Sequence, residues 1–279
     1  MIDFYDDISY KTSKLITNKY STSFSIAVSY LPAEMRRAVY SIYGFVRLAD
    51  EVVDTFKTIN QELLLKNFER DYYEVLENGI SMNPVLHSFA ITVKKYDIPP
   101  HLVESFFRSM KADLGKNHYS DSKELDEYIY GSANVVGLMC LKVFVNGDEQ
   151  LYCELEKPAM KLGSAFQKVN FLRDLKVDIE QLQRKYFPDF DVNTFNESVK
   201  YELIEDIEKD FEAAKEGIKR LPGKSKLAVL IAFVYYRHLL FKLSKTPAKE
   251  IMKKRIRLAG HFKMLLFGKA FLKYHLNTL

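Results

Sequence analysis

Two aspartates, Asp50 and Asp54, end an otherwise apolar stretch of the chain. Their spacing of four places both carboxylates on one face of a helix, and Tyr43 and Arg47 continue the same stripe. Like charges at this spacing repel each other, and they do so strongly when water is excluded, so a cation should neutralise them. Hard divalent ions take carboxylate oxygens and complete their shell with water and phosphate. The stripe therefore predicts a divalent metal site, with a solvent-exposed acidic helix end as the alternative.

A second polar stripe makes the metal interpretation stronger. Gln167, Asn170, Asp174 and Asp178 follow one another at spacings of three, four and four, so their amide and carboxylate groups share one helical face. Two such helices facing each other across a bundle could hold several divalent cations, an arrangement suited to a diphosphate. The chain has no glycine-rich phosphate loop, so metal ions would have to provide most of the phosphate recognition.

The elements that must position these stripes are predicted to be helices. Glycine and proline together make up 19 of 279 residues, about 7% against an average near ~12%. Apolar residues recur three and four apart, and the breaks between them are short turn-forming clusters. We therefore expect an all-α, single-domain helical bundle. The predicted helices are 34–56, 61–79, 101–116, 124–146, 150–183, 201–220, 225–244 and 248–276.

The composition also indicates a cellular location. Cys140 and Cys153 form neither a CxxC pair nor a zinc pattern, which fits a reducing compartment. The first residues are acidic, unlike a signal peptide, and the longest apolar run, 227–236, is shorter than the ~20 residues that span a bilayer. We expect a cytoplasmic protein.

Charge is distributed unevenly along the chain. From Leu221 onward there are 13 Lys or Arg and one acid, Glu250, a net charge of +12, whereas the preceding part carries −8. A basic region of this kind attracts phosphates or is simply a solvated helical surface. Its basic and apolar clusters alternate, which predicts peripheral contact with an anionic membrane at its inner face. We expect no nucleic-acid binding, because the chain contains no recognised nucleic-acid module.

Five motifs together resemble the squalene/phytoene synthase family. They occur in family order and at family-like intervals between about Ser21 and Tyr235. The motifs are SxSF at 21–24, LP at 31–32, RRAVYSIYGFVRLADEVVD, YIYGSANVVG and LGSAFQKVNFLRDLKVD. The resemblance implies an isoprenoid-synthase-type helical fold with a central cavity, in one domain spanning residues 1–279.

The resemblance also implies roles for individual residues. The metal-binding residues would be Asp50, Asp54, Asp174 and Asp178, with Mg²⁺ as the ion and Mn²⁺ as a substitute. The residues that hold diphosphates would be Ser21, Ser23, Arg47, Gln167, Asn170, Arg173 and Tyr235. Two catalytic tyrosines would be Tyr128, beside the reacting carbons, and Tyr43, near the departing diphosphate.

The activity implied by the resemblance is the head-to-head (1′-1) condensation of two prenyl diphosphates through a cyclopropylcarbinyl diphosphate. We expect two geranylgeranyl diphosphates to give phytoene. The alternative is two farnesyl diphosphates, which would give presqualene diphosphate, dehydrosqualene or, with NADPH, squalene. A non-catalytic helical assembly factor of the same superfamily is a third possibility.

The sequence departs from the family pattern at three places. Asn134 replaces a small glycine in the central motif, which could change the fit of the prenyl chain. Thr22 stands where the family often has a basic residue. Arg184 lies one residue further from Asp178 than the pattern requires, so it is left outside the predicted site. Several phenylalanines could wall the cavity, although core packing is favoured for any one of them: Phe24, Phe45, Phe107, Phe166 and Phe171.

Overall fold

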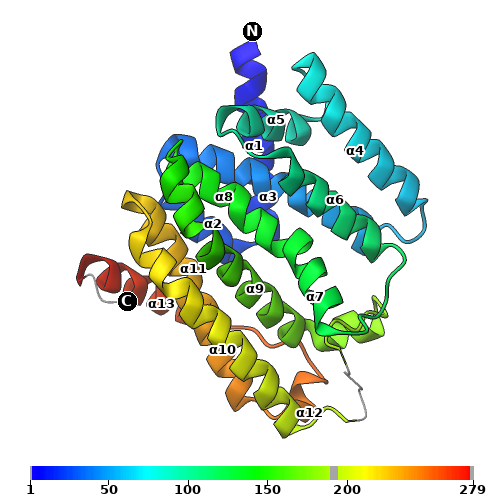
Figure 1. Cartoon of the computed structure of the whole chain (residues 1–279), viewed down its shortest axis with the longest axis vertical. Helices are drawn as coiled ribbons and strands as arrows, with labels where there is room; N and C mark the ends of the chain where they lie inside the picture. The colour runs from blue at the N-terminus through cyan, green and yellow to red at the C-terminus, as the bar shows by residue number, and fades with distance from the viewer. Residues whose placement is uncertain (1, 189–193, 277–279) are drawn as a thin grey trace.

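Helices account for the regular structure of this chain (Figure 1), which a computed structural model describes for residues 2–188 and 194–276. The helices are α1 (Ile2–Tyr20), α2 (Thr22–Ser29), α3 (Ala33–Asp54), α4 (Gln61–Asn78), α5 (Pro84–Lys95), α6 (Pro100–Asp113), α7 (Ser122–Ile129), the π-helical turn η1 (Tyr130–Asn134), α8 (Val135–Val145), α9 (Glu149–Glu180), α10 (Glu197–Arg220), α11 (Gly223–Lys245), α12 (Ala248–Ile251) and α13 (Gly260–Leu276). Within these ranges no β-strand forms, and the all-α prediction is confirmed.

Side-chain caps set several helix boundaries close to their predicted positions. Asn60 accepts a hydrogen bond from the Leu63 amide at the start of α4, and Asp148 accepts one from Leu151 at the start of α9, both at 2.9 Å. These bonds satisfy amides that have no partner within the helix. The prediction did not include α1, α2 and α5.

The predicted helix 248–276 is wrong, since α12 ends at Ile251 and α13 begins at Gly260. Between them, Ile256 and Leu258 are buried whereas Arg255 and Arg257 are exposed. This alternation has the period of two that belongs to extended chain, not to a helix. The extended segment leads Arg255 to the end of α9, where it pairs with Asp174.

Two groups of buried side chains form the core. One is built mainly from α3 to α6 and α8, and the other mainly from α9, α10, α11 and the C-terminal elements. α9 packs against α8, η1, α10 and α11 and therefore joins the two groups, as its place in the middle of the bundle indicates (Figure 1). The long polar stripe on α9 is thus held inside the bundle.

The π-helical turn η1 depends on close packing at Gly131. A Cβ atom at this position would lie 2.1 Å from the Ser109 Oγ and 2.5 Å from the Ser105 backbone oxygen on α6. We expect Gly131→Ala to lower the free energy of unfolding by about 1–3 kcal/mol, because the helices must separate to accommodate a methyl group. Gly137→Ala is the matched control, since its Cβ would meet only the Ala159 oxygen at 3.5 Å. Equal urea midpoints for the two variants would contradict this packing argument.

Two helical segments are long and apolar enough to cross a membrane, Ser122–Val145 and Gly223–Lys245. Buried residues make up 67% of the most apolar window of the first segment and 50% of that of the second. Both segments contribute to the core and to the wall of a central cavity. Both are accounted for as core helices of the bundle.

Candidate active site

A cavity of about 630 Å³ lies between the two core groups. Its wall includes every site residue that the sequence predicted: Ser21, Ser23, Tyr43, Arg47, Asp50, Asp54, Tyr128, Gln167, Asn170, Arg173, Asp174, Asp178 and Tyr235. The rest of the wall is largely apolar and includes small side chains such as Ala159, Ala214 and Ala232. One cavity therefore combines a charged region with space for hydrocarbon.

The polar stripe of α3 faces this cavity. Arg47 forms an ion pair with Glu51 one turn later, and its guanidinium lies 3.9 Å from an oxygen of Asp50. The guanidinium also lies over the Tyr20 ring, 4.3 Å from its centroid. Among the described residues, Asp50 has no ion-pair partner closer than this guanidinium, and its side chain lines the cavity.

Two arginines, Arg173 and Arg255, lie beside Asp174 in the polar stripe of α9. Arg173 donates two hydrogen bonds to the Asp174 carboxylate, at 2.9 and 2.5 Å. Arg255, from the extended segment, forms an ion pair with the same carboxylate at 2.7 Å and donates a hydrogen bond to its other oxygen at 3.2 Å. Sequence reasoning missed Arg255, because only the fold brings this segment to α9. Asp178, one turn beyond Asp174, has no such direct cationic partner among the described residues.

The electrostatics of the cavity fit a divalent cation. Burial and the neighbouring Asp54 raise the pKa of Asp50 to about 8. Burial, Asp174 and Asp54 raise the pKa of Asp178 to about 8, so the stripes of α3 and α9 are close enough to repel. Surplus negative charge on hard oxygen donors is what Mg²⁺ or a similar ion would neutralise.

Coordination here would need ligands from outside the chain. Among the described residues, no three acidic, histidine or cysteine side chains gather closely enough to form a metal-binding group. Mg²⁺ commonly binds through one or two protein carboxylates and shares its remaining positions with water and phosphate oxygens. The open carboxylates of Asp50 and Asp178 fit this type of site, in which a diphosphate supplies further ligands.

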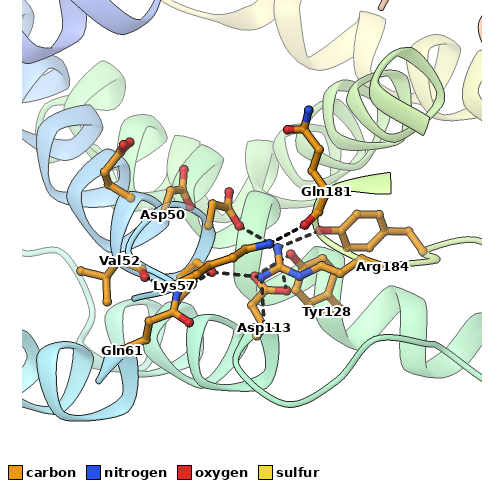
Figure 2. A network of polar contacts seen from close by, with 12 residues as sticks. Asp50, Val52, Lys57, Gln61, Asp113, Tyr128, Gln181 and Arg184 are labelled. Carbon is orange, nitrogen blue, oxygen red and sulfur yellow. Dashed lines mark hydrogen bonds and ion pairs between the residues drawn. The ribbon is translucent and has the colours of Figure 1, made fainter. Parts of the chain in front are cut away.

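Arg184, which the sequence prediction left out, lies at the centre of a buried network (Figure 2). It donates to Asp54 at 2.8 Å and to the backbone oxygen of Asp113 at 2.9 Å. It also lies 3.8 Å from the Asp113 carboxylate. Asp113, at the end of α6, was missed as well, since no second carboxylate stands three or four positions away from it. Arg184 therefore links α3 to α6 at the polar part of the cavity wall.

Tyr128 is held beside this network by a hydrogen bond and by stacking. Its hydroxyl donates to Asp113 at 2.8 Å, and its ring stacks on Tyr186 with centroids 5.4 Å apart. The Phe171 ring also stacks on Tyr186, with the ring centroids 3.9 Å apart. Burial and the Asp113 charge raise the pKa of Tyr128 well above its usual value, so it remains a neutral phenol.

The other predicted residues complete the wall. Ser21 caps α2 by accepting a hydrogen bond from the Phe24 amide at 3.4 Å, and the Phe24 ring stacks on Tyr43. Asn170 accepts a hydrogen bond from the Tyr236 hydroxyl at 3.3 Å. The residue pattern gave no reason to single out Tyr236, whose ring stacks on Phe166.

Some of the sequence-based expectations need correction. Asn134 does not line the cavity: it is buried, and its side-chain oxygen accepts a hydrogen bond from Ser164 at 3.0 Å. The amide therefore joins η1 to α9 instead of facing a substrate. Phe45 and Phe107 are fully buried in the core, as favoured for each phenylalanine, whereas Phe24, Phe166 and Phe171 depart from that expectation and line the cavity.

Comparison with known proteins gives a family match and similar named relatives. A family model described as squalene/phytoene synthase matches residues 17–261. The chain is 27% identical to the phytoene synthase of Arthrospira platensis over 263 residues, covering 85% of this chain and 84% of the relative. It is 26% identical to the 4,4′-diapophytoene synthase of Staphylococcus haemolyticus over 201 residues, covering 71% and 68% of the two chains.

Solved structures support the fold. A dehydrosqualene synthase superposes with a TM-score of 0.84 at 22% identity, covering 98% of each chain. The squalene synthase HpnC of Alicyclobacillus acidocaldarius superposes with a TM-score of 0.74 at 17% identity, covering 89% of this chain and 95% of HpnC. These similarities place the arrangement of helices among the isoprenoid synthase folds.

Proposed function

The chain belongs to the squalene/phytoene synthase family, and we propose that it is a prenyltransferase that joins two geranylgeranyl diphosphates head to head to give phytoene. One observation carries this proposal. The acidic stripes of α3 and α9 face the same cavity, whose remaining wall is largely apolar. Such a cavity can hold the charged and the hydrocarbon ends of a prenyl diphosphate at once.

The family uses a divalent metal, and we propose Mg²⁺ for this chain, with Mn²⁺ as a substitute. The residues that would hold it are Asp50, Asp54, Asp174 and Asp178. When bound, the cation supplies Lewis-acid stabilisation of the charge that develops on the departing diphosphate. Arg173 and Arg255 lie beside Asp174 and would bind the diphosphate oxygens at that end of the cavity.

The remaining wall suits a carbocation. Departure of the first diphosphate leaves an allylic cation, which the double bond of the second substrate attacks; loss of a proton then closes the cyclopropane ring. The rings of Phe24, Phe166 and Phe171 line the cavity and would exclude water, while each favourable cation–π contact contributes about 0.5–2 kcal/mol. The neutral phenol of Tyr128 would lie beside the reacting carbons. Departure of the second diphosphate, rearrangement and loss of a second proton give the hydrocarbon.

A C30 product is the second candidate. The similarity to a diapophytoene synthase and to the fold of a dehydrosqualene synthase favours two farnesyl diphosphates as the alternative substrates. With these substrates the reaction would stop at presqualene diphosphate, or the second diphosphate would depart and the resulting cation would lose a proton to give dehydrosqualene or take a hydride from NADPH to give squalene. A non-catalytic assembly factor is less well supported, because the charged cavity wall is complete.

A competition experiment decides between these products. The purified protein would receive Mg²⁺ and equal concentrations of farnesyl and geranylgeranyl diphosphate, with and without NADPH, and the hydrocarbons would be identified by mass spectrometry. We expect a C40 hydrocarbon whose amount does not depend on NADPH. A C30 hydrocarbon would move the proposal to the second candidate. Intact diphosphates in every sample would favour the assembly factor.

Metal binding should stabilise the fold more at high pH. Asp50 and Asp178 have pKa values of about 8 in the folded chain against 3.8 ordinarily, so the folded state without metal binds more protons than the unfolded state between these values. Its free energy of unfolding should therefore fall as pH rises towards 8. Mg²⁺ should offset this loss, so we expect a larger Mg²⁺-induced rise in Tm at pH 8.5 than at pH 6. Equal shifts at both pH values, at matched ionic strength, would contradict the metal site.

We also propose that the protein works in the cytoplasm, at the inner face of the membrane, and without nucleic acid. The two free cysteines fit a reducing compartment, which supports the cytoplasm. The basic C-terminal region supports contact with the membrane.

A further inference from the structure

α13 exposes a row of large apolar side chains on its outer side. Its inner side chains, Leu266, Phe267 and Ala270, are buried in the core. The opposite side carries the outer apolar face, which consists of Met264, Leu265, Phe271, Leu272 and Leu276. Leu265 and Leu272 are 65% and 62% exposed. Such a cluster on one helix needs a partner, because soluble surfaces carry few contiguous apolar patches of this kind.

The outer apolar face continues onto α11. α13 packs along α11 at the edge of the bundle (Figure 1), and the Tyr274 hydroxyl donates to the Gly223 oxygen at the start of α11. At the other end of α13, Phe262 stacks on His238 of α11. His238 in turn contacts the exposed ring of Phe241. The apolar surface thus extends across both helices.

The helix pair that carries this surface is cationic. The chain from Leu221 onward has a net charge of +12, and Glu250, its one acid, is paired with Lys253 and Lys254. Neither α11 nor α13 contains an acid; Lys224, Lys242, Lys245 and Lys269 on these helices are exposed, and Lys263 and Lys273 are partly exposed. A second copy of this chain would bring the same charge to the interface, which opposes self-association through this surface. An anionic lipid surface complements both the charge and the apolar side chains.

We propose that the outer apolar face of α13 inserts into the interface of an anionic membrane, with the helix lying along the surface. The buried side chains opposite it show why α13 would lie on the bilayer instead of crossing it. The Lys263 ammonium, on the inner side of α13, lies 3.4 Å from the Thr22 hydroxyl and over the Tyr235 ring, so α13 would lie between the membrane and the part of the cavity wall that Tyr235 forms. The proposal rests on the proposed function in one respect, that lipid substrates would then enter from the membrane.

A tryptophan reporter tests the insertion. The chain contains no tryptophan, so Leu272→Trp creates a single fluorophore on the outer apolar face. Vesicles of phosphatidylcholine with about 30% phosphatidylglycerol should shift its emission to the blue, and vesicles of phosphatidylcholine alone should shift it much less. Met82→Trp, at an exposed site between α4 and α5, is the control that should not respond. An emission maximum of Leu272→Trp that no vesicle changes would overturn the proposal.

A charge substitution gives a second, independent test. The double variant Leu265→Glu with Leu272→Glu should lower sedimentation with anionic vesicles at least tenfold, whereas Ile80→Glu with Met82→Glu should not. Both variants change exposed side chains, so folding should persist, as circular dichroism can verify. Activity on detergent-dispersed substrate should stay at the wild-type level, which separates failed docking from failed catalysis. Dimers that the Leu265 and Leu272 changes dissociate, without vesicle binding, would assign this surface to a second copy and overturn the proposal.

Discussion

Replacing Asp50 with asparagine should lower kcat by about 10³-fold, the usual size of the loss when one preorganised electrostatic contact to developing charge is removed. The same variant without metal should unfold at a higher temperature than the wild type. Burial and Asp54 raise the pKa of Asp50 to about 8, which means that the folded chain prefers this group uncharged. Asparagine provides the uncharged group permanently. Steady-state kinetics and thermal unfolding with and without Mg²⁺ measure both effects.

Asp178→Asn should behave in the same way, because burial, Asp174 and Asp54 raise its pKa to a similar value. Asp126→Asn on α7 is the matched control, since Asp126 is exposed and lies outside the cavity wall. It should change neither kcat nor the effect of Mg²⁺ on Tm. If Asp50→Asn loses activity but keeps the full Mg²⁺-induced stabilisation, Asp50 does not hold the metal.

Replacing Arg184 with methionine should destabilise the fold by about 3–5 kcal/mol, because one partner of a buried ion pair would be removed and the others left uncompensated. Arg184 is 5% exposed and bonds to Asp54 and to Asp113. Burial already raises the pKa of Asp113 to about 7, and loss of the arginine removes the largest influence that lowers it. Urea unfolding at pH 8, where both acids would be charged in the unfolded chain, measures the effect.

Arg184→Lys separates charge from geometry. Lysine keeps the positive charge, but it cannot donate from one planar group to Asp54 and Asp113 together. We therefore expect a smaller destabilisation than for Arg184→Met. Arg70→Met is the control, because Arg70 forms only exposed ion pairs, which contribute little. A loss below 1 kcal/mol for Arg184→Met would show that this network does not hold α3, α6 and the end of α9 together.

The acidic stripes were predictable because residues four positions apart in a regular helix lie on the same face. Asp50 and Asp54 on α3, and Asp174 and Asp178 on α9, needed only a regular helix to point the same way. That both helices face one cavity followed from the resemblance to a known family and not from spacing. The cavity wall contains all of these aspartates.

Arg184, Asp113 and Arg255 could not be predicted in this way, because each lies outside a periodic stripe. Gln183, just before Arg184, has a positive φ of 55°, so the chain reverses direction there and the count from Asp178 loses its helical meaning. Asp113 ends α6, and Arg255 lies in extended chain. Their ion-pair partners are 71 or more positions away, so only the tertiary fold brings them together.

The central claim is that two prenyl diphosphates react with each other inside one cavity. The stoichiometry of the reaction tests it most directly. Purified protein would be incubated with Mg²⁺ and geranylgeranyl diphosphate, and inorganic diphosphate and C40 hydrocarbon would be measured in the same sample. Asp50→Asn is the inactive control. Head-to-head condensation predicts two diphosphates released for each phytoene formed. Release of diphosphate with geranylgeraniol as the organic product, and no C40 hydrocarbon, would contradict the account.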